Sequence, residues 1–212
     1  MSGAPDLGAG AAAVPGAAAD PALEGAVRRA GFAALLEGRY PTLQELAVAA
    51  GVADEAAESV VTALVGAGRA TVTPDGRLDG IAGVTGRPTR HAIESPGRRP
   101  VRTWCGFDAV AIPAALGWAA TAVTTCGGCG SGLRIEIEDG APAGDGWGWL
   151  PPADCEHVLR DFCAAADLFC SREHLDRWRA AAGDPPGEAR SVADLAELGR
   201  AAWADCLPPV NP

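Results

Sequence analysis

The spacing of apolar residues changes along the chain from helical to strand-like, and this change constrains the fold more than any other feature. Between residues 21 and 66, apolar side chains recur every three or four positions, as on one face of an α-helix. The stretch LRIEIED at 133–139 instead alternates apolar and charged residues, which is typical of a half-buried β-strand. Helices followed by a mixed region predict an α+β protein whose sheet is small and mainly antiparallel.

The first part of this pattern, residues 21–83, predicts a winged-helix-like module. Helices are predicted at 21–38, 42–51 and 54–66. Thr42 and Glu45 have the spacing of a capping box, which marks the start of the second helix. The segment RATVTPDGRLDGI at 69–81 predicts two short strands around a Pro-Asp-Gly turn, in the place of a wing.

A winged helix either binds DNA or serves as scaffold, and the charge of the chain favours scaffold. The formal net charge is −10, whereas a nucleic-acid-binding face is normally basic. The segment DEAAESVVTALVGAG at 54–68, where a recognition helix would lie, has three acidic residues and no basic one. We therefore expect no nucleic-acid partner.

The N-terminal stretch and the cysteine content predict the cellular setting. Residues 1–20 are rich in Ala, Gly and Pro without a basic region, which predicts a flexible tail rather than a signal peptide. No apolar run reaches the ~20 residues of a membrane span, so no membrane association is expected. These features predict a cytoplasmic protein, in which seven cysteines indicate metal, redox or nucleophile chemistry rather than disulfides.

Residues 84–212 predict a second, catalytic domain of mixed α/β structure. Residues 84–100 are rich in Pro, Gly and Arg and predict a connector. Strands are predicted at 99–105, 119–125 and 133–139, and helices at 107–117, 152–162, 172–182 and 191–205. The segment AADLFCS at 165–171 fits either a helix continuation or a strand.

Cys105 and Asp108 stand three residues apart at the start of the helix predicted after residue 105. At this spacing both side chains lie on one face of the first helical turn. A helix N-terminus favours a thiolate, whereas a neighbouring carboxylate disfavours it. The pair therefore has two interpretations: a buried thiol beside an N-terminal helix acid, or a thiol whose proton is exchanged with the carboxylate.

The remaining cysteines give weaker signals. Cys126 and Cys129 form a CxxC pair, but no second CxxC or HxxxH completes a zinc site, so we expect none. Cys126 is predicted to pack in the interior and Cys129 to be an exposed loop thiol. Cys163 is predicted to be half-buried. No partner is predicted for Cys155 or Cys206, and the isolated histidines His91, His157 and His174 give no support for a Cys–His dyad.

Several segments together resemble the bacterial organomercurial (alkylmercury) lyases. WCGFDAVAIPAALG at 104–117 is similar to their W-C-x-x-D-x-x-x-x-P segment, and VLRDFCAAADLFCS at 158–171 to the segment of their second essential cysteine. CG at 126–127 and SVADLAELG at 191–199 resemble further family segments. The likeness covers residues of about 100–200. Ala164 stands where the family often has another cysteine, and Cys129 and Cys170 have no family counterpart.

The resemblance implies that Cys105, Asp108 and Cys163 cleave carbon–mercury bonds and hold the Hg(II) product, as part of mercury detoxification. Two soft thiolates and one proton carrier suffice for this chemistry, so no cofactor is expected apart from external thiols for turnover. Mercuric reductase or small thiols are the expected Hg(II) acceptors. A non-catalytic carrier of soft metals and a thiol-based winged-helix sensor are the alternatives; Asp108 argues against the carrier and the acidic third helix against the sensor.

Overall fold

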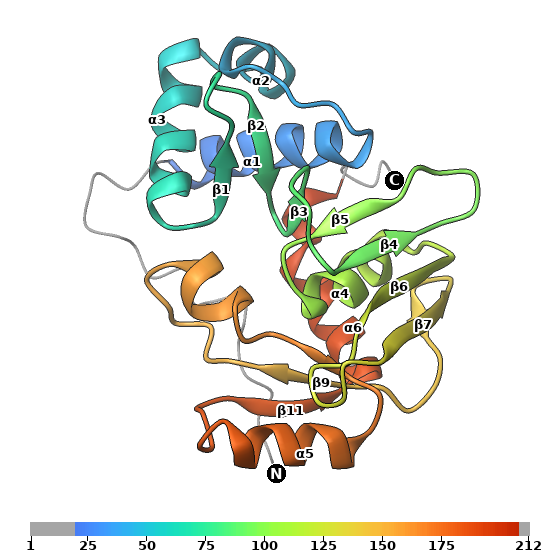
Figure 1. Cartoon of the computed structure of the whole chain (residues 1–212). Coiled ribbons are helices and arrows are strands. Elements are labelled where there is room, and N and C mark those ends of the chain that lie inside the picture. The colour runs from blue at the N-terminus through green and yellow to red at the C-terminus, as the bar shows by residue number, and fades with distance from the viewer. Residues whose placement is uncertain (1–19, 208–212) are drawn as a thin grey trace.

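Three N-terminal helices lie together at one end of the molecule, and the rest of the chain builds two antiparallel sheets, with α4 in the middle and α5 beside the smaller sheet (Figure 1). The computed structural model describes residues 20–207. Its helices are α1 (Pro21–Leu36), α2 (Leu43–Ala50), α3 (Asp54–Gly66), α4 (Gly106–Leu116), the π-helical turn η1 (Val158–Cys163), α5 (Arg172–Ala181), α6 (Val192–Ala202) and the 3₁₀ turn η2 (Ala204–Cys206). The predicted α+β class is confirmed.

The helices α1–α3 follow the sequence prediction closely. Thr42 caps α2: its hydroxyl accepts a hydrogen bond from Glu45 N (3.2 Å), and Glu45 accepts one from Thr42 N (2.8 Å). The helix ends at Gly51, whose φ of 69° is the left-handed conformation that glycine adopts without strain. The buried faces of the three helices pack on one another.

The larger sheet runs from the N-terminal part of the chain into the central part. Its strands are β1 (Ala70–Val72), β2 (Leu78–Ile81), β3 (Val84–Thr85), β4 (Ala92–Glu94), β5 (Val101–Thr103), β6 (Ala120–Thr125), β7 (Gly132–Glu138) and β8 (Ala141–Pro142), in the order β1-β2-β3-β5-β4-β6-β7-β8. The predicted domain boundary at 83/84 falls in the turn between β2 and β3, which pair through Gly80 and Thr85. The division at 83/84 and the winged-helix assignment stay predictions.

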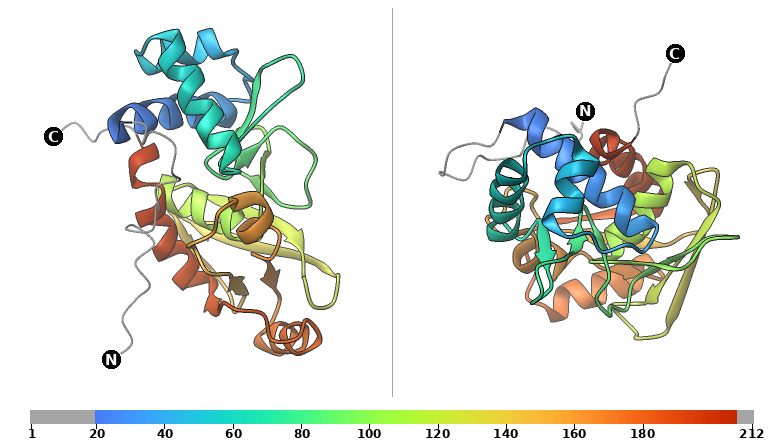
Figure 2. Two further views of the ribbon diagram at one scale, coloured as in Figure 1. Left: turned by 90° about the vertical axis from the view of Figure 1, so that its left-hand side faces the viewer. Right: turned by 90° about the horizontal axis from the view of Figure 1, so that it is seen from above.

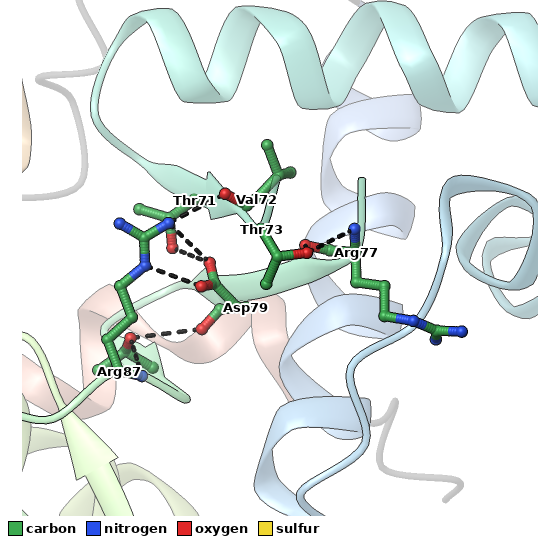
Figure 3. Close-up of polar contacts among 7 residues, drawn as sticks. Thr71, Val72, Thr73, Arg77, Asp79 and Arg87 are labelled. Atoms are coloured by element: carbon green, nitrogen blue, oxygen red, sulfur yellow. Dashed lines mark hydrogen bonds and ion pairs between the residues drawn. The ribbon is translucent and has the colours of Figure 1, made fainter. Parts of the chain in front are cut away.

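Asp79 of β2 ties the β1–β2 hairpin to the chain that follows β3. This buried carboxylate accepts hydrogen bonds from Thr71 Oγ1 (2.6 Å) and Arg87 Nε (2.8 Å) (Figure 3). Arg87 also donates to the carbonyl of Val72 (2.9 Å). The ion pair with Arg87 offsets the free-energy cost of burying the Asp79 carboxylate. These side-chain contacts therefore reinforce the pairing of β1 with β2.

Helix α4 is buried on all sides and is the centre of the core. Residues Ala109–Ile112 have no exposed surface, as expected for a helix that is apolar all round. Helix α6 runs alongside it (Figure 2), and a side-chain carbon at Gly199 would lie 2.6 Å from Ala111. As predicted, α4 ends at Gly117, with φ of 63°. The close packing fixes the position of the helix N-terminus, where Cys105 and Asp108 lie.

Two sequence predictions in the central region are wrong. Residues 84–100 are not only a connector, because they include β3 and β4. Strand β4 pairs with β5 and β6, a non-local arrangement that the broken apolar pattern does not indicate. The helix predicted at 152–162 is replaced by η1. This turn is held by a tertiary contact, in which Val158 N donates to the Ala67 carbonyl (3.0 Å), and by a local one from His157 N to Asp161 (2.9 Å).

A second, three-stranded sheet was not predicted. It has the order β10-β9-β11, with β9 (Trp147–Leu150), β10 (Leu168–Phe169) and β11 (Glu188–Ser191). The ambiguous segment 165–171 is therefore partly a strand. Helix α5 covers this sheet through Trp178, whose ring packs on Trp149 (5.7 Å between centroids) and Phe169 (5.2 Å). The strands were missed because they are short and pair across long sequence separations.

The described residues leave out most of the N-terminal stretch. The predicted tail at 1–20 lies, except for Asp20, outside the described residues. Within residues 20–207, no helix is long and apolar enough to cross a membrane.

The N-terminal helices are expected not to bind DNA. Helix α3 begins with Asp54 and Glu55, and like charges there repel phosphates. A gel-shift titration with duplex DNA at low salt, where non-specific binding is strongest, should show no retardation. Retardation that disappears as salt is raised would contradict this prediction and favour a sensor.

Candidate active site

Cys105 lies between β5 and α4, where it is the N-cap of the helix. The residue is extended (φ −143°, ψ 176°) and its side chain has no exposed surface. Both its backbone N–H and its thiol donate to the same oxygen of Asp108, with distances of 3.1 Å from N and 3.2 Å from Sγ to Oδ2. The sequence prediction that the two side chains share the first turn of the helix is confirmed.

The segment after η1 approaches the start of α4 at Gly106. Gly106 N donates to the Ala166 carbonyl (3.0 Å), and a side-chain carbon at Gly106 would lie 2.8 Å from Leu168 Cγ. Only glycine fits this close approach. Because Cys163 ends η1, three residues before Ala166, this contact brings the second predicted thiol to the first.

The structure brings together the three residues singled out in the sequence. The two sulfurs of Cys105 and Cys163 and a carboxylate oxygen of Asp108 all lie within 4.8 Å of one another. Two thiolates bound to one metal ion by bonds of about 2.3 Å lie about 3.8 Å apart in tetrahedral geometry and up to about 4.6 Å apart in linear geometry, so this cluster is compact enough to share one ion. Cys105 and Asp108 are buried, whereas Cys163 is partly exposed. A ligand that arrives from solvent therefore reaches the cluster from the side of Cys163.

Burial sets the protonation of this cluster. Desolvation raises the pKa of Asp108 to about 7. Hydrogen bonds from Cys105 and Trp104 favour the carboxylate and lower this pKa, but they offset the desolvation only in part. Desolvation, the contact with Cys163 and the charge of Asp108 raise the pKa of the Cys105 thiol well above its ordinary value. Near neutral pH Cys105 is therefore a thiol, and Asp108 can both accept and give a proton.

One contact to Asp108 was not anticipated from the sequence. Gly83, in the β2–β3 turn, has φ of +84°, and a side-chain carbon there would lie 2.8 Å from Asp108 Cγ. The turn is held by hydrogen bonds from Trp104 N to the Gly83 carbonyl and from Trp203 Nε1 to the Ala82 carbonyl, both 2.9 Å. The glycines of GIAGV at 80–84 give no sequence signal for such a role.

Asp108 should titrate near pH 7. In infrared difference spectra of wild type against Asp108→Asn, the C=O stretch of the protonated carboxyl should be present at pH 5 to 6 and disappear with a midpoint of about 7. A midpoint near the ~3.9 of a solvated aspartate would contradict the burial argument.

A second cluster of metal-ligating side chains lies outside this site. One ligand atom each from Cys126, Cys129, Cys170 and His174 lies within 4.8 Å of the others. Cys126 is buried and Cys129 exposed, as predicted. However, the premise that nothing completes the CxxC pair is wrong, because Cys170 and His174 do so. The spacing C-x₃-H at 170–174 was the missed signal.

The histidines differ from the prediction at one position. His91 contacts Thr124 Oγ1 (2.8 Å), and His157 accepts a hydrogen bond from Arg160 N (3.2 Å), so both have structural roles. His174 is not isolated: its Nδ1 lies 2.9 Å from Cys170 Sγ. Cys155 and Cys206 belong to neither cluster among the described residues.

Comparison with known proteins assigns the chain. The alkylmercury lyase family model matches residues 84–204, which include both clusters. The chain belongs to the alkylmercury lyase family. A crystal structure of the mercury-bound form of MerB2 is similar to the chain in fold, with a TM-score of 0.79 and 19% identity over 87% of this chain and 91% of that one. Among curated protein sequences no match is found.

Membership of the alkylmercury lyase family makes the chain an enzyme that cleaves the carbon–mercury bond of organomercurials. A non-catalytic metal carrier and a winged-helix sensor are not favoured. The family match covers Cys105, Asp108 and Cys163, so the resemblance of the short motifs is confirmed at the level of the family.

Proposed function

We propose that Cys105, Asp108 and Cys163 carry out the protonolysis of organomercurials. The observation that supports this most strongly is the approach of two thiols and a carboxyl group within 4.8 Å, with Asp108 in hydrogen-bonding contact with Cys105 Sγ. Thiolates are the soft ligands that mercury prefers, and the third group can carry a proton. A metal carrier has no need of such a group.

Capture of the substrate begins at Cys105. Its thiol proton passes to the Asp108 carboxylate 3.2 Å away, and the thiolate bonds to the mercury of an organomercurial R–Hg–X while the anionic ligand X leaves to solvent. Free Cys105 is held as a thiol by burial, so the formation of the mercury–sulfur bond drives this transfer. Asp108, with a pKa raised to about 7, is then in its acid form next to the bound substrate.

Cleavage requires the second thiol. Cys163 loses its proton to solvent and adds to mercury, which increases electron density on the carbon bonded to the metal. The carbon–mercury bond then breaks as its electron pair takes the proton of Asp108, so that a hydrocarbon leaves and Asp108 returns to the carboxylate. Hg(II) stays between the two thiolates. Each cycle thus consumes two thiol protons, one of which ends on carbon and the other in solvent.

Release of Hg(II) is proposed to need external thiols, because a two-thiolate complex dissociates slowly until another thiolate attacks. Small thiols or a mercuric reductase are the proposed acceptors, and a reducing compartment such as the cytoplasm would keep Cys105 and Cys163 reduced. No resident cofactor enters any step of this mechanism.

We propose that residues 21–83 act as scaffold for the site. Two contacts support this role: the Ala67 carbonyl accepts a hydrogen bond from Val158 N at the start of η1, and Gly83 packs against Asp108. The first of these contacts holds the turn that carries Cys163, and the second limits the position of the carboxyl group. The N-terminal module would thereby act on catalysis without touching substrate.

Phenylmercury and the reduced protein test the proposed function. Without added thiol, benzene release should stop at about one equivalent per chain; with excess small thiol it should continue. Capture of phenylmercury without any benzene, at any thiol concentration, would contradict the proposal and favour a carrier.

A further inference from the structure

The second cluster joins three segments at one end of the smaller sheet. Cys126 and Cys129 lie in the loop between β6 and β7, Cys170 follows β10, and His174 is in the first turn of α5. We propose that these four residues form a tetrahedral Zn(II) site with a structural role.

The spacing of the ligand atoms suits zinc. All four lie within 4.8 Å of one another, and the sulfurs of Cys129 and Cys170 are 3.9 Å apart. Tetrahedral zinc with Zn–S bonds of about 2.3 Å places two sulfurs about 3.8 Å apart. Cys170 Sγ and His174 Nδ1 are closer, at 2.9 Å, so that metal binding would replace their direct contact by a shared ion.

The loop that carries the CxxC pair has a defined backbone. Cys126 N donates to the Ser131 carbonyl and Gly130 N to the Cys126 carbonyl, both at 2.8 Å. Cys170 N donates to Cys126 Sγ (3.4 Å), which joins the end of β10 to the CxxC loop. Gly130 has φ of +72°, which suits glycine at the end of the turn.

The loop is also shaped to reach the histidine. A side-chain carbon at Gly128 would lie 2.6 Å from the backbone oxygen of His174 and 2.9 Å from its Cβ. Any other residue at Gly128 would push the loop away from α5 and separate the CxxC pair from His174. The close approach at Gly128 therefore keeps the four ligands together. A loop whose exposed thiols had no shared role would not require such tight packing.

The donor set selects the metal. Three thiols and one imidazole form a Cys₃His site, which is typical of structural zinc and unsuited to Mg²⁺ or Ca²⁺. With four protein ligands no position stays open for substrate. The site would fix Cys170, the end of the segment 163–170 that lies away from the proposed active site. This segment also contacts the CxxC loop, because Gly127 N donates to the Leu168 carbonyl (2.9 Å).

Zinc content tests this proposal directly. Protein purified under reducing conditions without chelators from zinc-supplemented cells should contain about one zinc per chain. Replacement by Co(II) should give the intense visible d–d bands and the thiolate-to-cobalt charge transfer of a tetrahedral site. Both signals should be lost in Cys129→Ser Cys170→Ser and weakened in His174→Ala.

Two matched variants separate this cluster from other thiols. Cys105→Ser Cys163→Ser, which removes the proposed mercury ligands, and Cys155→Ser, which changes a cysteine outside both clusters, should keep one zinc per chain. Because metal content is measured without substrate, the outcome is independent of the lyase proposal. Three results would overturn the zinc site: zinc far below one per chain with no uptake by reduced protein, zinc that survives Cys129→Ser Cys170→Ser, or a Cys129–Cys170 disulfide in place of metal.

Discussion

Asp108→Asn should lower the rate of benzene release from bound phenylmercury by on the order of 10²–10⁴-fold, the usual loss when a general acid–base group is removed. Asparagine keeps the size of the side chain and an acceptor oxygen for Cys105 N, but it carries no transferable proton. Both thiols remain, so mercury should still bind. Single-turnover measurements that follow benzene and bound mercury separately would reveal this split.

The stability of the same variant provides its control. The folded-state pKa of Asp108, about 7, lies above its unfolded value of about 3.9. The stability of the fold therefore falls as pH rises from about 4 to 7, where the carboxyl ionises in the unfolded chain but not in the folded one, and the full loss is present above pH 7. Asp108→Asn should therefore be more stable than wild type at pH 8, by up to about 4 kcal/mol, with little gain at pH 4. A folded variant with undiminished benzene release would require the withdrawal of Asp108 as proton donor.

Cys105→Ser and Cys163→Ser should each impair both capture and cleavage, because a hydroxyl is a hard and weak ligand for mercury. Retention of mercury should fall by more than the 10- to 100-fold typical of changes in the second shell of a metal site. Serine at position 105 keeps a good N-cap, so loss of function there should not reflect a lost helix. The measurement is bound mercury after a wash with a small thiol, in a Cys129→Ser Cys170→Ser background so that the second cluster does not retain mercury.

Cys206→Ser, at a cysteine outside both clusters, serves as the comparison and should retain mercury like wild type. Full retention by Cys163→Ser would show that a single thiolate holds the product. The proposed two-thiolate intermediate would then be wrong, although Cys105 could still be the capturing residue.

Local patterns in the sequence predicted much of the fold. Thr42, Glu45 and Gly51 mark helix ends through interactions within a few residues, and LRIEIED follows the strand period directly. For the same reason the spacing of Cys105 and Asp108 is enough to place both on one helical turn. The meeting of this pair with Cys163 came from family resemblance, since no local pattern indicates the contact at Gly106.

The features that were missed depend on contacts between distant segments. Strand β4 inserts between β5 and β6, and η1 is held by Ala67 rather than by its own helical propensity. Cys170 and His174 belong to a strand end and a helix start that meet the CxxC loop only in three dimensions. A second CxxC or an HxxxH is the familiar completion of a zinc site, and the C-x₃-H pair at 170–174 matches neither.

Single-turnover cleavage of phenylmercury in D₂O tests the central claim, that a thiolate-bound organomercurial is protonated on carbon by an exchangeable acid in this site. The proposed mechanism predicts about one equivalent of benzene per chain, each molecule carrying one deuterium, with Hg(II) retained by Cys105 and Cys163 and slow release of benzene in Asp108→Asn. Intact phenylmercury recovered from wild-type protein, or benzene without deuterium, would contradict it.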